Sequence, residues 1–314
     1  MNFEQAMSSY PAILGEGAVI ERVRRDLPVD LDPYIANSGL IYDPAARDIL
    51  ESMYRGYLDI GLHHDLPMIV LAPTWRANPE RILKSSYSGH KTINQDCVRF
   101  IRDLRGSYDG YARKIFIGGL MACKGDAYNP AEALSEKAAE VFHRTQAEIL
   151  AVSGVDFMMV STLPALGESV GMGRVLAATG IPYVLSFVIR PEGTLLDGTP
   201  LEEAVSKIDD ATQTAPLFYS VNCVHPSIFQ EGVGRAARNS KELKRRILGL
   251  QANTSALSPE ELDGRDNLDT TAPEPFADLM LELHTDYGLK VLGGCCGSDQ
   301  RHISEIARRL NQSG

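Results

Sequence analysis

The feature that most constrains the fold of this chain is a repeated alternation of short apolar runs with helical patterns. The runs are continuous and rich in β-branched residues, which is typical of parallel strands buried on both faces. They cover residues 12–14, 68–72, 115–120, 157–160, 183–189, 217–221, 247–250 and 290–292. Eight strand-then-helix units predict an α/β fold whose natural closed form is a single (β/α)8 TIM barrel.

Capping residues support the helices between these runs. Asp43 precedes a proline and should cap the helix that follows it. Thr199, three residues before Glu202, predicts a capping box, and Ser298 is the expected cap of the last helix. Gly288 should end the helix before the last run. An open doubly wound sheet is the alternative, but no Gly-x-Gly-x-x-Gly turn follows the first run.

The length and charge of the chain limit its organisation and partners. The 314 residues contain no evident linker, so we expect residues 1–314 to form one domain, with a long connection at 254–275 near the site. With 31 basic and 41 acidic residues the net charge is −10, which argues against binding nucleic acid or anionic membranes. No apolar run approaches the roughly 20 residues of a membrane helix. The sequence leaves a homo-oligomer open.

The cysteines indicate a compartment and a site. There are five, which is too few for a disulfide scaffold and odd in number, and no signal peptide is evident, so we expect a reducing, cytoplasmic location. Cys223 follows the sixth run, and Cys295 and Cys296 follow the eighth. In a barrel these positions share the catalytic rim. Adjacent residues on a strand point to opposite faces, so the vicinal pair can converge only where the strand has ended, which the flanking glycines permit.

Three converging thiolates would form a zinc site with one open coordination position. The other interpretation is that these cysteines are small buried hydrophobic residues. Zinc with three thiolates has a net charge of about −1, so it activates water poorly but can bind a substrate thiol and lower its pKa. We therefore infer alkyl transfer to sulfur. A zinc hydrolase, which would need histidine or carboxylate ligands, and a non-catalytic zinc or thiol sensor are the alternatives.

The stretches 221–226 and 293–299 carry Asn-Cys and Gly-Gly-Cys-Cys-Gly motifs, and on these motifs the sequence resembles the homocysteine S-methyltransferase family. The likeness extends from about Ile13 to Leu310, and the turn at 14–17 is closest to the betaine-homocysteine branch. The resemblance implies that Cys223, Cys295 and Cys296 are the catalytic, zinc-binding residues. A small-molecule thiol, homocysteine, would bind to the zinc and attack a methyl donor in line, giving methionine.

The resemblance also implies a substrate pocket. Glu16 would bind the amino group of homocysteine, with Gly17 near its carboxylate. Thr74 follows the second strand in a family-like turn, and Asn222 belongs to the Asn-Cys motif, so both are implied pocket residues.

The sequence departs from the family pattern in two places. Ser161 stands at the end of the fourth strand, where the family has a glutamate, and Trp75 and Arg76 replace an Asn-Thr pair after the second strand. A serine can hydrogen-bond an ammonium group but cannot neutralise it, so the acceptor could be a different thiol. The donor stays open between S-methylmethionine, S-adenosylmethionine and a betaine-like compound. Trp75 could contact a cationic donor or simply fill a loop at the rim.

Overall fold

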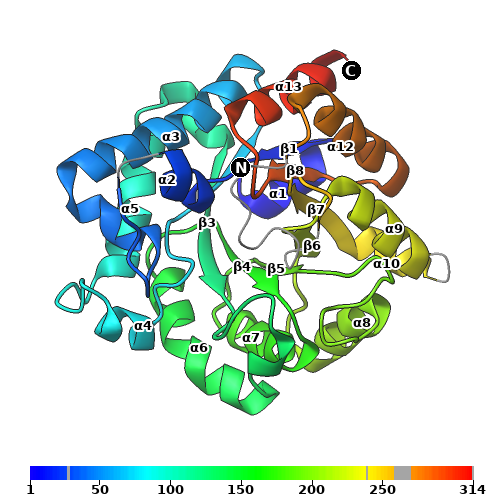
Figure 1. The fold of residues 1–314 in the computed structure, drawn as a ribbon, viewed down its shortest axis with the longest axis horizontal. Helices are drawn as coiled ribbons and strands as arrows, with labels where there is room; N and C mark the ends of the chain where they lie inside the picture. Colours follow the sequence, from blue (N-terminus) through cyan, green and yellow to red (C-terminus); the bar gives the residue numbers. More distant parts are fainter. Residues whose placement is uncertain (27–28, 238–239, 258–269, 313–314) are drawn as a thin grey trace.

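The fold is a closed barrel of eight parallel strands, each paired with its neighbours in sequence order and the eighth with the first (Figure 1). The computed structural model describes residues 1–26, 29–237, 240–257 and 270–312. The strands are β1 (Ile13–Gly15), β2 (Met68–Leu71), β3 (Ile115–Ala122), β4 (Phe157–Leu163), β5 (Tyr183–Phe187), β6 (Phe218–Asn222), β7 (Ile247–Ala252) and β8 (Val291–Gly294). The predicted (β/α)8 TIM barrel is confirmed, and each predicted run overlaps one strand.

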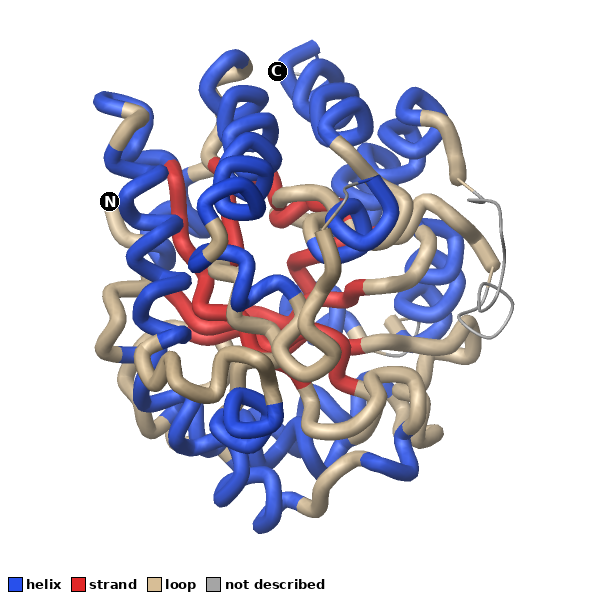
Figure 2. The backbone as a smooth tube through the Cα atoms, turned by 60° about the vertical axis from the view of Figure 1, so that its left-hand side comes forward, coloured by secondary structure: helices blue, strands red, loops and turns tan. Residues whose placement is uncertain are grey.

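Helices surround the barrel on the outside (Figure 2). The α-helices are α1 (Phe3–Ser9), α2 (Ile20–Asp26), α3 (Pro44–His63), α4 (Pro79–Lys84), α5 (Ile93–Gly106), α6 (Glu136–Ala151), α7 (Leu166–Ala177), α8 (Leu201–Ala211), α9 (Pro226–Ala236), α10 (Lys241–Arg246), α12 (Pro273–Tyr287) and α13 (Gln300–Gln312). Short 3-10 helices are η1 (Asn37–Tyr42), η2 (Asp109–Lys114) and η3 (Pro130–Glu132). In the described part of the chain, no helix is both long and apolar enough to cross a membrane. Residues 258–269 of the connection at 254–275 lie outside the described residues. That residues 1–314 form a single domain remains a prediction.

Two of the predicted helix boundaries are confirmed. The Asp43 carboxylate accepts a hydrogen bond from the Ala46 backbone N–H at 2.9 Å and caps α3. Gly288 ends α12 with a left-handed φ of 72°, a conformation that glycine adopts without steric cost.

Two other predicted caps are wrong. Helix α8 begins after Pro200 without a side-chain cap, because Thr199 belongs to the preceding turn, where its carbonyl accepts from the Leu195 N–H at 2.8 Å. The Ser298 hydroxyl donates to the Cys295 carbonyl at 2.7 Å and accepts from the Ala18 N–H at 3.1 Å, so it joins two strand-end turns. At Ser298 the hydroxyl is occupied by these two partners, and α13 begins only at Gln300.

The amino end of the barrel is closed by α1. Phe3 is 1% exposed and stacks on Phe157, with ring centroids 4.1 Å apart. It belongs to a buried cluster with side chains from most of the strands, including Phe116 and Phe218. Because this end is packed with apolar side chains, a ligand must enter from the carboxyl ends of the strands, where barrel enzymes build their sites.

We predict that Phe3→Ala lowers the free energy of unfolding by about 3 kcal/mol, since it leaves a cavity under the barrel. Urea unfolding followed by circular dichroism would measure this loss. The control is Leu83→Ala on α4, because Leu83 is 73% exposed and its truncation should change stability little. Equal midpoints for the two variants would show that α1 does not stabilise the barrel.

Candidate functional site

A cavity of about 250 Å³ opens at the carboxyl ends of the strands. All of the predicted site residues except Thr74 line it: Glu16, Gly17, Ser161, Asn222, Cys223, Cys295 and Cys296. Thr74 is fully buried behind the wall, where its hydroxyl donates to the Leu120 carbonyl at 2.7 Å. The structure therefore brings the predicted residues other than Thr74 together at the cavity, and Thr74 supports the wall from behind.

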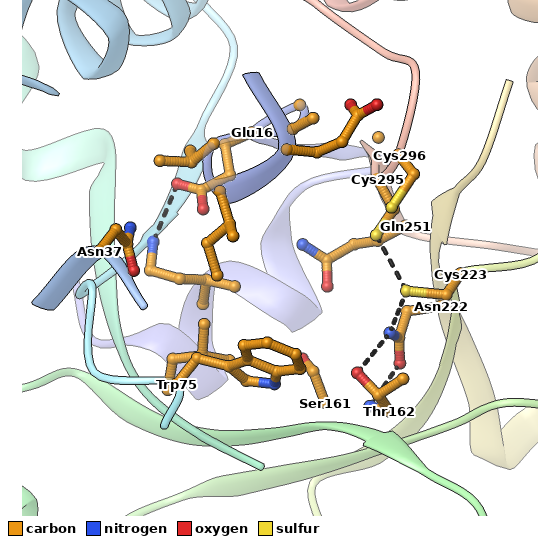
Figure 3. A pocket seen from close by; sticks show the side chains of 18 of the residues that line it. Glu16, Asn37, Trp75, Ser161, Thr162, Asn222, Cys223, Gln251, Cys295 and Cys296 are labelled. Carbon is orange, nitrogen blue, oxygen red and sulfur yellow. Dashed lines mark hydrogen bonds between the residues drawn. The ribbon is translucent and has the colours of Figure 1, made fainter. Parts of the chain in front are cut away.

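The three strand-end cysteines meet on one side of this cavity (Figure 3). The Cys223 and Cys295 sulfurs are 3.0 Å apart, and the Cys223 thiol also interacts with that of Cys296. Strand β8 ends at Gly294, directly before the vicinal pair, as the predicted convergence requires. The Cys295 N–H donates to the Ala252 carbonyl at 2.7 Å, so the end of β7 holds the turn in place.

The ionisation of these thiols is coupled. Hydrogen bonds from Cys295 and Cys296 hold the pKa of Cys223 well below its usual range. The bond to Cys223 in turn holds the pKa of Cys295 well above its usual range and raises that of Cys296 to about 12. Such opposite pKa shifts are expected for neighbouring thiols, because the negative charge of the first thiolate disfavours ionisation of the next thiol. A divalent cation among them would remove that opposition and favour three thiolates.

The donor set therefore fits zinc chemically, although the sulfurs are packed closely. In tetrahedral zinc sites, Zn–S distances of about 2.3 Å imply sulfurs roughly 3.7 Å apart, which exceeds the 3.0 Å between Cys223 and Cys295. In agreement with this close packing, no group of three His, Cys, Asp or Glu side chains is spaced to hold a metal ion among the described residues 1–26, 29–237, 240–257 and 270–312. Metal binding would require the thiols to rotate apart.

Asn222 braces Cys223 with hydrogen bonds that occupy its whole amide. Its Nδ2 donates to the Cys223 sulfur at 3.1 Å and to the Thr162 hydroxyl at 3.2 Å. Its Oδ1 accepts from the Thr162 N–H at 2.9 Å and from the Ser186 hydroxyl at 2.7 Å. Thr162 and Cys223 have φ values of 65° and 58°, a strained region for such residues, and these bonds help to hold them there.

Glu16 lies on the β1 side of the cavity without a described basic partner. Its carboxylate accepts from the Leu71 N–H at 3.0 Å, and its side chain is buried. Burial raises its pKa to about 8, against the opposing effect of that hydrogen bond. At Gly17 a Cβ atom would lie 2.7 Å from the Tyr57 hydroxyl, so only glycine fits beside Glu16. A cationic ligand would favour the charged carboxylate.

Sequence reasoning missed Tyr128, which lies on the loop after β3. Its side chain lines the cavity, and its hydroxyl donates a hydrogen bond to Cys223 that helps to lower the pKa of that thiol. No strand-end pattern marks residue 128, because the loop reaches the cysteines by folding back over the barrel rim.

Arg76, one of the residues that depart from the family pattern, holds the loop that carries Tyr128. The Arg76 guanidinium donates to the carbonyls of Cys123, Lys124 and Gly125 at 3.3, 3.4 and 2.7 Å. It also lies 4.5 Å from the centre of the Trp75 ring, so one face of that indole already carries a cation. Trp75 lines the cavity, and Arg76 is a positioning residue for the loop that carries Tyr128.

A buried carboxylate fixes the same loop from the other side. The fully buried Glu168 of α7 accepts from the Lys124 N–H at 2.7 Å and from the Leu134 N–H at 3.1 Å. It also pairs with His143 of α6 at 2.8 Å. One side chain therefore ties both ends of the segment between β3 and α6.

The fold and the site define a class of protein: a (β/α)8 barrel whose cavity is built around cysteines from the ends of β6 and β8. The family model for homocysteine S-methyltransferases matches residues 13–310, and the chain belongs to this family.

Characterised relatives agree with this assignment. The chain is 26% identical over 194 residues to the homocysteine S-methyltransferase YbgG of Bacillus subtilis, covering 60% of this chain and 58% of that protein. It is 22% identical over 326 aligned positions to betaine–homocysteine S-methyltransferase 1 of Mus musculus, covering 98% and 74%. The metallated homocysteine methyltransferase MmuM of Escherichia coli shares the fold, with a TM-score of 0.75, 18% identity, and coverage of 97% and 98%. The match thus spans less than two thirds of the length of YbgG.

We predict that Cys223 is the first thiol to be alkylated in the reduced, metal-free protein at neutral pH. Its lowered pKa favours the thiolate, the reactive form, whereas burial raises the pKa of Cys97 well above its usual range. Iodoacetamide labelling followed by peptide mass spectrometry would measure the order. In Tyr128→Phe one donor to the thiolate is lost, so the labelling profile should move to higher pH. An unchanged profile would show that Tyr128 does not act on Cys223.

Proposed function

We propose that this protein transfers a methyl group from a sulfonium or ammonium donor to a thiol, with homocysteine as acceptor and methionine as product. The observation that carries the proposal is the gathering of Cys223, Cys295 and Cys296 at one cavity, in a chain of the homocysteine S-methyltransferase family. The names of the relatives, which include homocysteine methyltransferases from two bacteria, support the same reaction.

We propose Cys223, Cys295 and Cys296 as zinc ligands. Bound zinc would lower the pKa of the acceptor thiol. The chain's own residues would position the ligands and line the pocket. Tyr128 and Asn222 hold Cys223 through hydrogen bonds to its sulfur. The cavity wall formed by Ala72, Pro73 and Leu120 is apolar, which would favour methyl transfer over hydrolysis.

Glu16 is the proposed partner of the acceptor's amino group. Its buried carboxylate has no described cation beside it, and an ammonium group would provide one. Gly17 lines the cavity next to Glu16, and we propose that its backbone lies near the acceptor's carboxylate. We further propose a cytoplasmic location, because all five cysteines are free and the proposed ligands must stay reduced. A homo-oligomer remains a prediction.

A different thiol acceptor is the second candidate, and Ser161 favours it. This residue is 7% exposed, and its hydroxyl has no hydrogen-bond partner in the described part of the chain. An acceptor without an ammonium group would not need a second carboxylate there.

The proposed activity predicts about one zinc ion per chain in protein purified under reducing conditions, and methionine formation from homocysteine with at least one methyl donor. S-methylmethionine, S-adenosylmethionine and glycine betaine would be tested in turn, with methionine measured by mass spectrometry. Alanine at Cys223, Cys295 or Cys296 should abolish both zinc retention and turnover. The control is Cys97→Ala, whose thiol is buried in α5 outside the cavity lining.

Full zinc content in all three cysteine variants would refute the ligand assignment. Bound zinc without turnover from any donor would instead favour another acceptor or a sensor.

Replacing Ser161 tests the acceptor. We expect Ser161→Glu to tighten homocysteine binding by about 1–3 kcal/mol, because a second carboxylate would then face the ammonium group. Calorimetric titration of the zinc-loaded protein measures this affinity, and N-acetylhomocysteine, which lacks the ammonium group, should show no gain. Ser161→Ala is the matched control, since it removes the hydroxyl without adding charge. Equal affinities in Ser161→Glu and wild type would indicate a pocket for a different thiol.

A further inference from the structure

We propose that Gln251 binds the carboxylate of the acceptor amino acid through its side-chain amide, next to the ammonium site at Glu16. This inference rests on the proposed methyl transfer to homocysteine, and it assigns a specificity-determining residue to that reaction. Together the two side chains would make the pocket selective for α-amino acid thiols, although Ser161 supplies no second carboxylate for the ammonium group.

Strand β7 fixes the backbone of Gln251 inside the site. The residue is in register with Asn222 of β6 on one side and with Gly293 of β8 on the other. Its carbonyl accepts a hydrogen bond from the Cys223 N–H at 3.1 Å. The side chain therefore starts from the strands that carry the cysteines, and groups held on strands are placed more precisely than groups on loops.

The glycine at position 293 lets the Gln251 side chain approach the β1 turn. A Cβ atom on Gly293 would lie 3.3 Å from the Gln251 Cγ and 3.1 Å from the Glu16 carbonyl oxygen. The stem of Gln251 and the backbone of Glu16 therefore flank the same point. In Figure 3 the amide projects from beside Cys295 into the cavity, on the side that faces Glu16. It stands between the proposed thiol site and the proposed ammonium site.

The state of the Gln251 amide points to a ligand. The residue is 8% exposed and lines the cavity. Its amide makes no hydrogen bond to another residue in the described part of the chain, and its atoms keep surface that is open to the cavity. An amide that is largely withdrawn from water and has no partner is costly, so it calls for a specific explanation. A ligand in the cavity would pair it.

The chemistry of an amino acid decides which of its groups the amide would bind. The ammonium group only donates hydrogen bonds, and the carboxylate only accepts them. The Glu16 carboxylate can therefore pair with the ammonium group but not with the carboxylate. Among the described residues that line the cavity, Arg24 is the only basic one, and it is exposed on α2. A carboxylate held inside the cavity depends on neutral N–H donors, and the Gln251 Nε2 is such a donor.

The shape of the acceptor fits this arrangement. In homocysteine the ammonium group and the carboxylate are attached to the same carbon, and a short chain of two methylenes separates that carbon from the sulfur. With the sulfur at the cysteines and the ammonium group at Glu16, the carboxylate lies beside the ammonium group, on the stretch that Gln251 borders. The carboxylate takes no part in methyl transfer, so Gln251 should affect the acceptor KM more than kcat.

The test compares homocysteine with aminopropanethiol, which is homocysteine without its carboxylate. In zinc-loaded protein, Gln251→Leu should lower kcat/KM for homocysteine by about tenfold or more, the size expected for one hydrogen bond to a charged group. The value for aminopropanethiol and the donor KM should stay within about twofold of the wild type. Gln251→Glu places a like charge against the carboxylate, so the preference should reverse in favour of aminopropanethiol. A change in the donor KM with unchanged discrimination between the two thiols would overturn the proposal.

Two controls separate recognition from other roles. Arg24→Gln should retain the preference for homocysteine; if it removes the preference and Gln251→Leu does not, Arg24 binds the carboxylate and the proposal is wrong. Gln251→Leu should keep the zinc content and the melting temperature of the wild type, because the amide makes no hydrogen bond within the described protein. A loss of zinc or a lower melting temperature would show a structural role instead.

Binding calorimetry keeps this proposal distinct from the proposed function. The probes are methionine and its decarboxylated analogue methylthiopropylamine, whose binding requires no turnover. If methyl transfer fails with every donor, but methionine binds the wild type about tenfold more tightly than Gln251→Leu and the amine binds both equally, the carboxylate site stands and the proposed function fails. If methyl transfer proceeds and methionine binds both proteins equally, the carboxylate site is refuted and the proposed function stands. Methionine that binds neither protein would also refute the site.

Discussion

Closure of the barrel between β1 and β8 is the constraint on which the site depends. Gly15 and Gly293 meet so closely that a Cβ on either would lie 3.0 Å from the other's Cα. The Gly294 N–H donates to the Glu16 carbonyl at 2.9 Å, and Ser298 links the two turns through Ala18. This seam places the vicinal cysteines and the buried carboxyl on the rim of one cavity. A side chain at either glycine would separate the strands that carry both.

The polar groups around the cavity fall into two kinds. Asn222 and Glu168 use their oxygens and nitrogens within the protein, and each holds a backbone segment that carries a group of the site. Asn37 and Ser161 are also buried, but each has a side-chain oxygen without a hydrogen-bond partner among the described residues. A buried polar group stabilises a fold only when it is paired, so the first kind supports the architecture and the second suits contact with a ligand.

Departures from a family pattern can have structural rather than chemical consequences. Arg76 departs from the family pattern, and its guanidinium holds three successive carbonyls of the loop that carries Tyr128. Ser161 remains a difference in the pocket itself, since its hydroxyl has no partner among the described residues. Sequence alone could not separate these cases, because both residues lie near the carboxyl ends of strands and differ only in what they contact across the rim.

The sequence by itself determined the barrel and the placing of three cysteines at strand ends. Apolar runs and strand endings are local patterns, and closure follows from having eight such units. Only the tertiary structure decided that Cys223 meets Cys295, 72 residues away, that Tyr128 reaches them, and that the Ser161 hydroxyl is buried without a partner among the described residues. These outcomes depend on which loops fold over the rim and on burial in three dimensions. Local periodicity carries no information about either.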